Sequence, residues 1–82
     1  MYRAEVIVTL KPGVLDPQGK AVRGGLAALG YGEVSDVRVG KYIELRLQAD
    51  SAEAARQRVE EMGRRLLANP VIEDFRVSIS EG

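Results

Sequence analysis

Few side chains in this 82-residue chain could make or break covalent bonds. The chain has neither cysteine nor histidine, which excludes a catalytic thiol, a serine–histidine pair and a metal site built on either residue type. Ser35 and Ser78 fall in predicted strands and Ser51 lies beside a predicted helix start, where serine usually has a structural role. Nucleophilic catalysis is therefore not expected, and no catalytic or metal-binding residue is assigned.

The carboxylates do not suggest an acid/base pair. Glu60 and Glu61 lie on a predicted helix, Glu73 and Asp74 lie where a predicted strand begins, and basic residues are interspersed throughout. An acid/base pair needs an environment that separates the pKa values of two carboxyl groups, and spacing alone supplies no such pocket. We therefore interpret these carboxylates as parts of solvated surfaces.

The charge balance gives little reason to expect nucleic acid or membrane partners. Twelve basic residues offset twelve acidic ones, so no net field attracts an anionic surface. An RNA-binding sheet needs exposed aromatic residues, and the chain has only three tyrosines and one phenylalanine. The glycine-bearing loop before Asp16 only faintly resembles a phosphate loop, and an acidic helix cap repels phosphate.

The length predicts one compact domain over residues 1–82. A core this small gives the fold only marginal stability. Because the chain has no cysteine to form disulfides, we expect self-association to supply the additional stability. Charges within residues 1–5 do not match the apolar core of a signal peptide, and no apolar run approaches membrane-spanning length. The expected location is the cytoplasm.

The first part of the chain predicts a strand and a helix. Apolar and polar residues alternate over residues 2–10, the pattern of a half-buried strand. Pro12 and Gly13 suit a type II turn, because proline fixes φ and glycine accepts a positive φ. Asp16 followed by Pro17 then predicts a capped helix start.

The middle of the chain predicts two strands in a hairpin. Val37 and Val39 indicate a short strand, and residues 42–48 alternate in the manner of a longer one. Gly40 and Lys41 between them suit a tight turn.

The last part predicts a helix and a final strand. Asp50 with Glu53 three positions later forms a capping-box pattern at a helix start, and Asn69-Pro70 predicts the helix end. Residues 74–79 then place Phe75, Val77 and Ile79 on one face of a strand.

The resulting order is β-α-β-β-α-β. Four amphipathic strands and two amphipathic helices are best satisfied by an antiparallel sheet with both helices on one face. The sequence therefore predicts a ferredoxin-like α+β sandwich.

Two features are not explained by a simple core. Val14 and Leu15 are adjacent, apolar and outside either periodic pattern, so they either cover the end of the sheet or form a docking site for a partner. The other sheet face carries both signs of charge, which suits a wet surface or a registered pairing with a second copy. The residues on that face include Arg3, Glu5, Glu44, Arg46, Asp74 and Arg76.

Two segments resemble one known family. Residues 9–19, TLKPGVLDPQG, and residues 36–45, DVRVGKYIEL, are similar to the PurS family, the small subunit of phosphoribosylformylglycinamidine (FGAM) synthase. The first segment is specific, and its distance from the second agrees with the family. The resemblance covers nearly the whole chain in length and element order.

The resemblance implies a subunit without catalytic activity of its own. The complex converts an amide of formylglycinamide ribonucleotide (FGAR) into the amidine of FGAM, in purine biosynthesis. A glutaminase subunit releases ammonia, and a large synthetase subunit activates the amide with ATP and Mg²⁺. The small subunit, as a homodimer or tetramer, joins them, assists ammonia transfer and binds no cofactor itself.

Carried over onto matching positions, the resemblance makes two segments the candidate partner contacts. These are the loop of Gly13, Val14, Leu15 and Asp16, and the turn of Gly40, Lys41 and Tyr42. The main alternative function is a small-molecule-sensing regulatory domain of ferredoxin-like shape. A small acyl-phosphate hydrolase on the same fold is disfavoured, because the sole asparagine, Asn69, lies at a helix end before Pro70.

Overall fold

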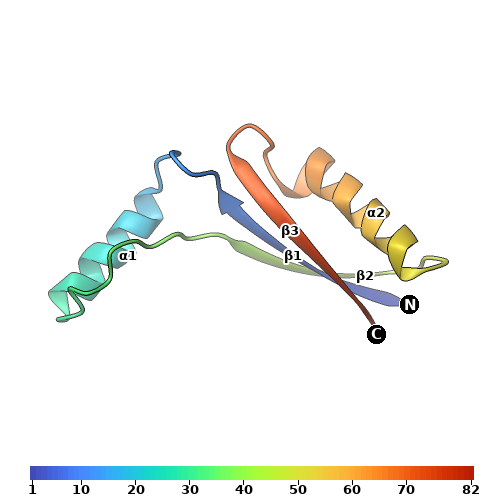
Figure 1. Ribbon diagram of the computed structural model, residues 1–82, viewed down its shortest axis with the longest axis horizontal. Coiled ribbons are helices and arrows are strands. Elements are labelled where there is room, and N and C mark those ends of the chain that lie inside the picture. Colours follow the sequence, from blue (N-terminus) through green and yellow to red (C-terminus); the bar gives the residue numbers. More distant parts are fainter.

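A computed structural model describes all residues from 1 to 82 and contains one three-stranded antiparallel sheet with two α-helices (Figure 1). The strands lie in the order β2-β1-β3, with β1 paired to both neighbours. The prediction of an α+β fold with an antiparallel sheet is confirmed, and the layout is consistent with a ferredoxin-like arrangement. The elements are β1 (Tyr2–Leu10), α1 (Pro17–Ala28), β2 (Lys41–Leu47), α2 (Ala52–Met62), a π-helical turn (Gly63–Leu67) and β3 (Glu73–Glu81).

The core lies between α2 and one face of the sheet. Ala4, Val6 and Val8 of β1 are fully buried there, beneath Ala55 and Val59 of α2. The alternation in the sequence predicts this face, because every second residue of a strand points to the same side. Half-buried side chains from the neighbouring strands pack around this centre, among them Ile43, Leu45, Phe75, Val77 and Ile79.

The predicted strand at Val37 and Val39 is not formed, and Gly40-Lys41 is not a hairpin turn. Residues 34–40, here called the return segment, have no strand partner and lead directly into β2. The reason lies at Gly40, whose backbone lies so close to the Val8 carbonyl oxygen that a Cβ would collide with it. The segment is thus held against the end of β1 and does not fold back beside β2.

The prediction that both helices cover one sheet face is wrong for the single chain. Helix α1 projects from the sheet on an arm, defined here as residues 11–40, and lies at the far end of the molecule from α2 (Figure 1). Its only buried residue is Gly19. The cause is the straight return segment, which carries α1 beyond the reach of its own sheet.

Both helices begin at a side-chain cap. Asp16 caps α1 as predicted, whereas the cap of α2 is Ser51 and not Asp50, because the Ser51 hydroxyl accepts the Ala54 N–H at 3.1 Å. Helical structure ends before Asn69, as predicted. Neither helix combines the length and apolarity needed to cross a membrane.

Candidate functional site

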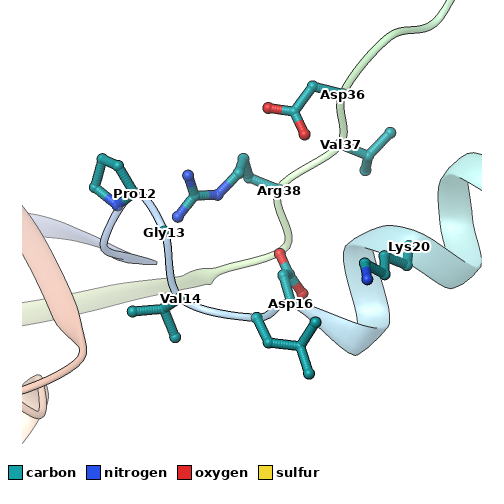
Figure 2. Close-up of a pocket in the computed structure, with 9 residues that line it drawn as sticks. Pro12, Gly13, Val14, Asp16, Lys20, Asp36, Val37 and Arg38 are labelled. Carbon is teal, nitrogen blue, oxygen red and sulfur yellow. The ribbon is translucent and has the colours of Figure 1, made fainter.

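The predicted partner loop forms one wall of an open groove at the base of the arm. The groove has a volume of about 450 Å³, and Gly13, Val14, Leu15 and Asp16 all line it. The opposite wall comes from the return segment (Figure 2). Gly13 has φ of +87°, and the Val14 N–H donates to the Lys11 carbonyl at 3.1 Å, so the turn predicted at Pro12-Gly13 is present.

Asp16 is the residue that joins the two walls. One carboxylate oxygen accepts the Gly19 N–H at 2.8 Å, and the other accepts the Val39 N–H at 3.0 Å. Gly19 must be glycine here, because a Cβ would collide with the Val37 carbonyl oxygen. Hydrogen bonds from Val39 and then Gly19 favour the ionised form and lower the pKa of Asp16.

The lowered pKa of Asp16 gives a prediction about acid. A carboxyl group with a folded-state pKa below its usual value stabilises the fold above that usual value, and this contribution is lost as pH falls through the folded pKa. The arm should therefore loosen only in acid below pH 3.8, the ordinary value for this group. NMR should show the Gly19 and Val39 amide shifts following a single titration with a midpoint below 3.8.

Asp16→Asn is the matched control, because asparagine keeps an acceptor oxygen but does not titrate over this range. In that variant neither amide should follow the acid titration. Different midpoints for the two amides in the native chain, or a shared midpoint at or above the ordinary value, would contradict a shared carboxylate clamp.

Arg38 strengthens the base of the arm from the return segment. Its guanidinium donates to the Leu10 carbonyl at the end of β1, and Figure 2 shows the side chain reaching toward the loop at Pro12 and Gly13. Sequence reasoning did not assign a role to Arg38 or to Lys20, which also lines the groove. The spacing of Asp16 and Gly19 signalled a helix cap, but no pattern signalled the contact with residues 38 and 39.

The second predicted contact segment is divided by the structure. Gly40 and Lys41 line a groove of about 290 Å³ together with Asp16, so they lie near the first loop. Tyr42 lines neither of these two grooves. Its hydroxyl donates to Glu5, which raises the pKa of Tyr42.

Tyr42 belongs to a charged network on the sheet face opposite α2. Arg3 on this face pairs with Glu5 at 3.3 Å and with Glu44 at 3.0 Å. Of the charges expected on this face, Arg3, Glu5 and Glu44 are therefore paired with one another, and exposed pairs of this kind contribute little to stability.

A second loop with exposed apolar side chains lies beside the partner loop. The Lys11 N–H donates to the Ile72 carbonyl at 2.8 Å, and the Lys11 ammonium pairs with Asp74 at 3.2 Å. Leu15 is 65% exposed on one side of this junction, and Val71 is 79% exposed on the other. Sequence reasoning missed the second loop, because the two loops are brought together by contacts of Lys11 with residues far away in the sequence, Ile72 and Asp74.

Two charged side chains at the base of the arm are engaged by the backbone. Asp16 is occupied by two backbone N–H groups, and Arg38 by a backbone carbonyl. No group of three or more acidic residues lies where it could hold a metal ion. The base of the arm therefore presents exposed apolar side chains together with the charged side chains of Lys20 and Asp36.

Comparisons with known proteins agree on one family. The sequence model described as PurS, phosphoribosylformylglycinamidine (FGAM) synthase, matches residues 3–81. The chain is 51% identical over 83 aligned residues to the FGAM synthase subunit PurS of Synechocystis sp., covering 99% of this chain and 83% of that protein. It is 48% identical to the Bacillus subtilis subunit PurS, covering 99% of this chain and 95% of the relative.

Solved structures show the same similarity in three dimensions. Bacillus subtilis PurS superposes with a TM-score of 0.86 at 49% identity, covering 99% of this chain and 100% of that one. A chain in the structure of PurLQS from Thermotoga maritima superposes with a TM-score of 0.85 at 30% identity, covering 98% of this chain and 99% of that one.

Proposed function

This chain belongs to the PurS family, and we propose that it is the non-catalytic small subunit that bridges the glutaminase and synthetase subunits of FGAM synthase in purine biosynthesis. Its similarity to a chain of PurLQS from Thermotoga maritima carries this proposal. The exposed apolar loops at the base of the arm supply a surface that a bridging subunit needs. The expected compartment is the cytoplasm, which contains ATP and glutamine.

The division of labour follows from the residues that this chain has. Without histidine or cysteine it lacks the usual means of attacking an amide, so glutamine hydrolysis belongs to the glutaminase subunit. ATP and Mg²⁺ are used by the synthetase subunit, and this subunit binds no cofactor. Ammonia released into neutral water becomes ammonium, which has no lone pair for attack. Holding the two active sites together keeps ammonia at high effective concentration.

The partner contacts in this proposal are Gly13, Val14, Leu15 and Asp16, with Gly40, Lys41 and Tyr42. Asp16 lines both grooves at the base of the arm, which supports treating the first six as one surface. Leu15 supplies the exposed apolar side chain that such a contact would bury.

Self-association, as a homodimer or tetramer, is the second part of the proposal, and the dimensions of the chain support it. A compact monomer of 8.9 kDa exposes about 4800 Å² of surface, whereas this chain exposes 5846 Å². Its radius of gyration is 16.0 Å, compared with about 12 Å for a compact domain of this length. The excess of roughly 1000 Å² is close to the ~800 Å² that each partner buries in a typical stable interface.

Reconstitution from purified subunits tests the bridging role. The chain alone should neither hydrolyse glutamine nor turn over ATP. The glutaminase and synthetase together should form FGAM from glutamine at least about tenfold faster once this chain is added. With ammonium salt as the nitrogen source, the synthetase should need the chain much less, because no transfer between subunits is required.

Two results would overturn the proposal. The first is glutamine-dependent activity that is the same with and without the chain. The second is hydrolysis of glutamine or ATP that follows the purified chain through successive columns.

A further inference from the structure

Helix α1 and the chain that follows it form the walls of a further open groove, which none of the proposed partner contacts lines. This groove has a volume of about 380 Å³. Its lining residues are Lys20, Arg23, Gly24 and Ala27 of α1, with Gly32 and Val34 from the chain after the helix. Lys20 and Arg23 are the only charged side chains in the lining, and both are cations. The groove is therefore suited to a negatively charged ligand.

The two cations are not neutralised within the chain. None of its ion pairs contains either of them, and Glu33, which lies between two lining residues in the sequence, does not line the groove. Arg23 donates its Nε–H to the Val34 carbonyl at 3.4 Å, while the terminal nitrogens of its guanidinium have no acceptor within the chain. This bond orients the guanidinium at the groove and leaves its remaining N–H groups free for a ligand. Figure 2 shows Lys20 on the side of α1 that faces the return segment.

Lys20 and Arg23 are close enough to hold one anion together. Residues three apart on a helix lie on adjacent turns, with about 5–6 Å between their Cβ atoms. Their like charges repel each other in the empty groove, and a shared anion would remove that repulsion. The guanidinium offers paired N–H donors that match two phosphate oxygens, and the ammonium adds a point charge. Helical spacing places both cations on the face of α1 opposite the apolar side chains of Val22 and Leu26.

Two glycines open the groove to a ligand larger than a simple ion. Gly24 lies inside α1, where glycine is less favourable than alanine, and no atom lies within 4 Å of the Cβ that it lacks. Packing within the chain therefore does not require glycine at this position. Gly32 has the same open space. The missing side chains leave backbone accessible to a ligand, beside the small apolar side chains of Ala27 and Val34.

We propose that this groove binds a small phosphate monoester, with the phosphate group held by Lys20 and Arg23 and the organic part lying over Gly24 and Gly32. A phosphate monoester carries a charge of about −1.5 to −2 at pH 7, which matches the two cations better than a single carboxylate does. The volume of about 380 Å³ falls within the roughly 300–1,000 Å³ typical of small-molecule sites, so it has room for an organic part. The site goes beyond the bridging role and shares no residue with the proposed partner contacts.

NMR titration of the full chain with three probes tests the proposal. The probes are AMP, adenosine, which lacks the phosphate, and inorganic phosphate, which lacks the organic part. In about 0.15 M salt, which screens general charge attraction, AMP should shift the Gly24 and Gly32 amides with a Kd of about 1 mM or lower. Adenosine should shift neither amide, and inorganic phosphate should bind at least about threefold more weakly than AMP. The proposal is overturned if AMP shifts neither amide, or if either other probe binds as tightly as AMP.

Removing the two cations tests whether they hold the phosphate. Lys20→Gln with Arg23→Gln should weaken AMP binding by about tenfold or more, because two charge-assisted contacts are lost. Arg46→Gln with Arg58→Gln is the matched control, since it removes the same charge at two exposed positions outside the groove and outside every ion pair. This control should bind AMP within about twofold of the native chain. Equal weakening by the two pairs would assign AMP binding to net charge and overturn the site.

Filling the groove tests the place of the organic part while both charges stay. Gly24→Leu should weaken AMP binding about fivefold or more, because the new side chain occupies the groove. Gly25→Leu is the matched control, being the same substitution at a neighbouring helical position that does not line the groove. It should keep the native affinity, and circular dichroism should show both variants folded. Native affinity in Gly24→Leu, or equal weakening in both, would contradict the proposed position. Glutamine-dependent activity of the three-subunit mixture reports on the bridging role separately.

Discussion

Val14→Asp combined with Leu15→Asp should leave the chain folded and weaken its binding to the other FGAM synthase subunits by about thirtyfold or more. Both residues lie on the loop before α1, outside the buried core. Burying even one uncompensated carboxylate in an apolar contact costs roughly 2 kcal/mol, which corresponds to this change in affinity. Surface plasmon resonance against the purified partner subunits measures it, and circular dichroism checks the fold.

The matched control for this double variant is Gln48→Asp with Gln57→Asp. It adds the same charge at two exposed positions, one just after β2 and one on α2, both away from the partner loop. Its affinity for the partners should stay within about twofold of the native value. If both pairs weaken binding equally, net charge is responsible; if neither does, the loop is not a contact.

Val59→Ala should produce the largest loss of stability from a small change. Val59 is fully buried and belongs to a cluster of only five buried residues. Removing two buried carbons costs about 2 kcal/mol through lost transfer free energy and the cavity that remains. For a domain of this size the melting temperature should fall by about 8–16 °C. Thermal unfolding must be compared at one chain concentration, because self-association stabilises the folded state.

Gln57→Ala is the matched control on the same helix. Gln57 is exposed, so its truncation should change the free energy of unfolding by no more than about 0.5 kcal/mol. Similar melting temperatures for the two variants would show that the face of α2 that packs on the sheet is not the main source of stability.

The sequence was informative wherever local rules decide the outcome. The alternation in residues 2–10 identified β1 and its buried face, and Asp16-Pro17 identified the start of α1. The Ser51 cap was missed, because Asp50, Ser51 and Glu53 allow two overlapping capping patterns and only backbone geometry selects one. The partner loop was identified as apolar residues outside any periodic pattern, and its role in assembly stays a prediction.

The elements around Gly40 were not decided by local rules. By composition, Val37, Val39 and Gly40 fit a hairpin. Contacts between residues that are distant in the sequence prevent this turn from forming. Asp16 accepts the Val39 N–H, Arg38 donates to the Leu10 carbonyl, and Gly40 lies against Val8. The two residues of each pair are far apart in the sequence. The path of the chain around Gly40 therefore could not be predicted from any short stretch of neighbouring residues.

By itself, the sequence determined which residues form strands β1, β2 and β3 and helices α1 and α2, which faces are apolar, and to which family the chain belongs. These properties follow from the side-chain order along a strand or helix. Only the tertiary structure decided that α1 leaves its own sheet and that the loops at residues 11–16 and 69–72 lie together. The physical reason is that hydrogen bonds between residues far apart in the chain fix the path of the backbone between its elements.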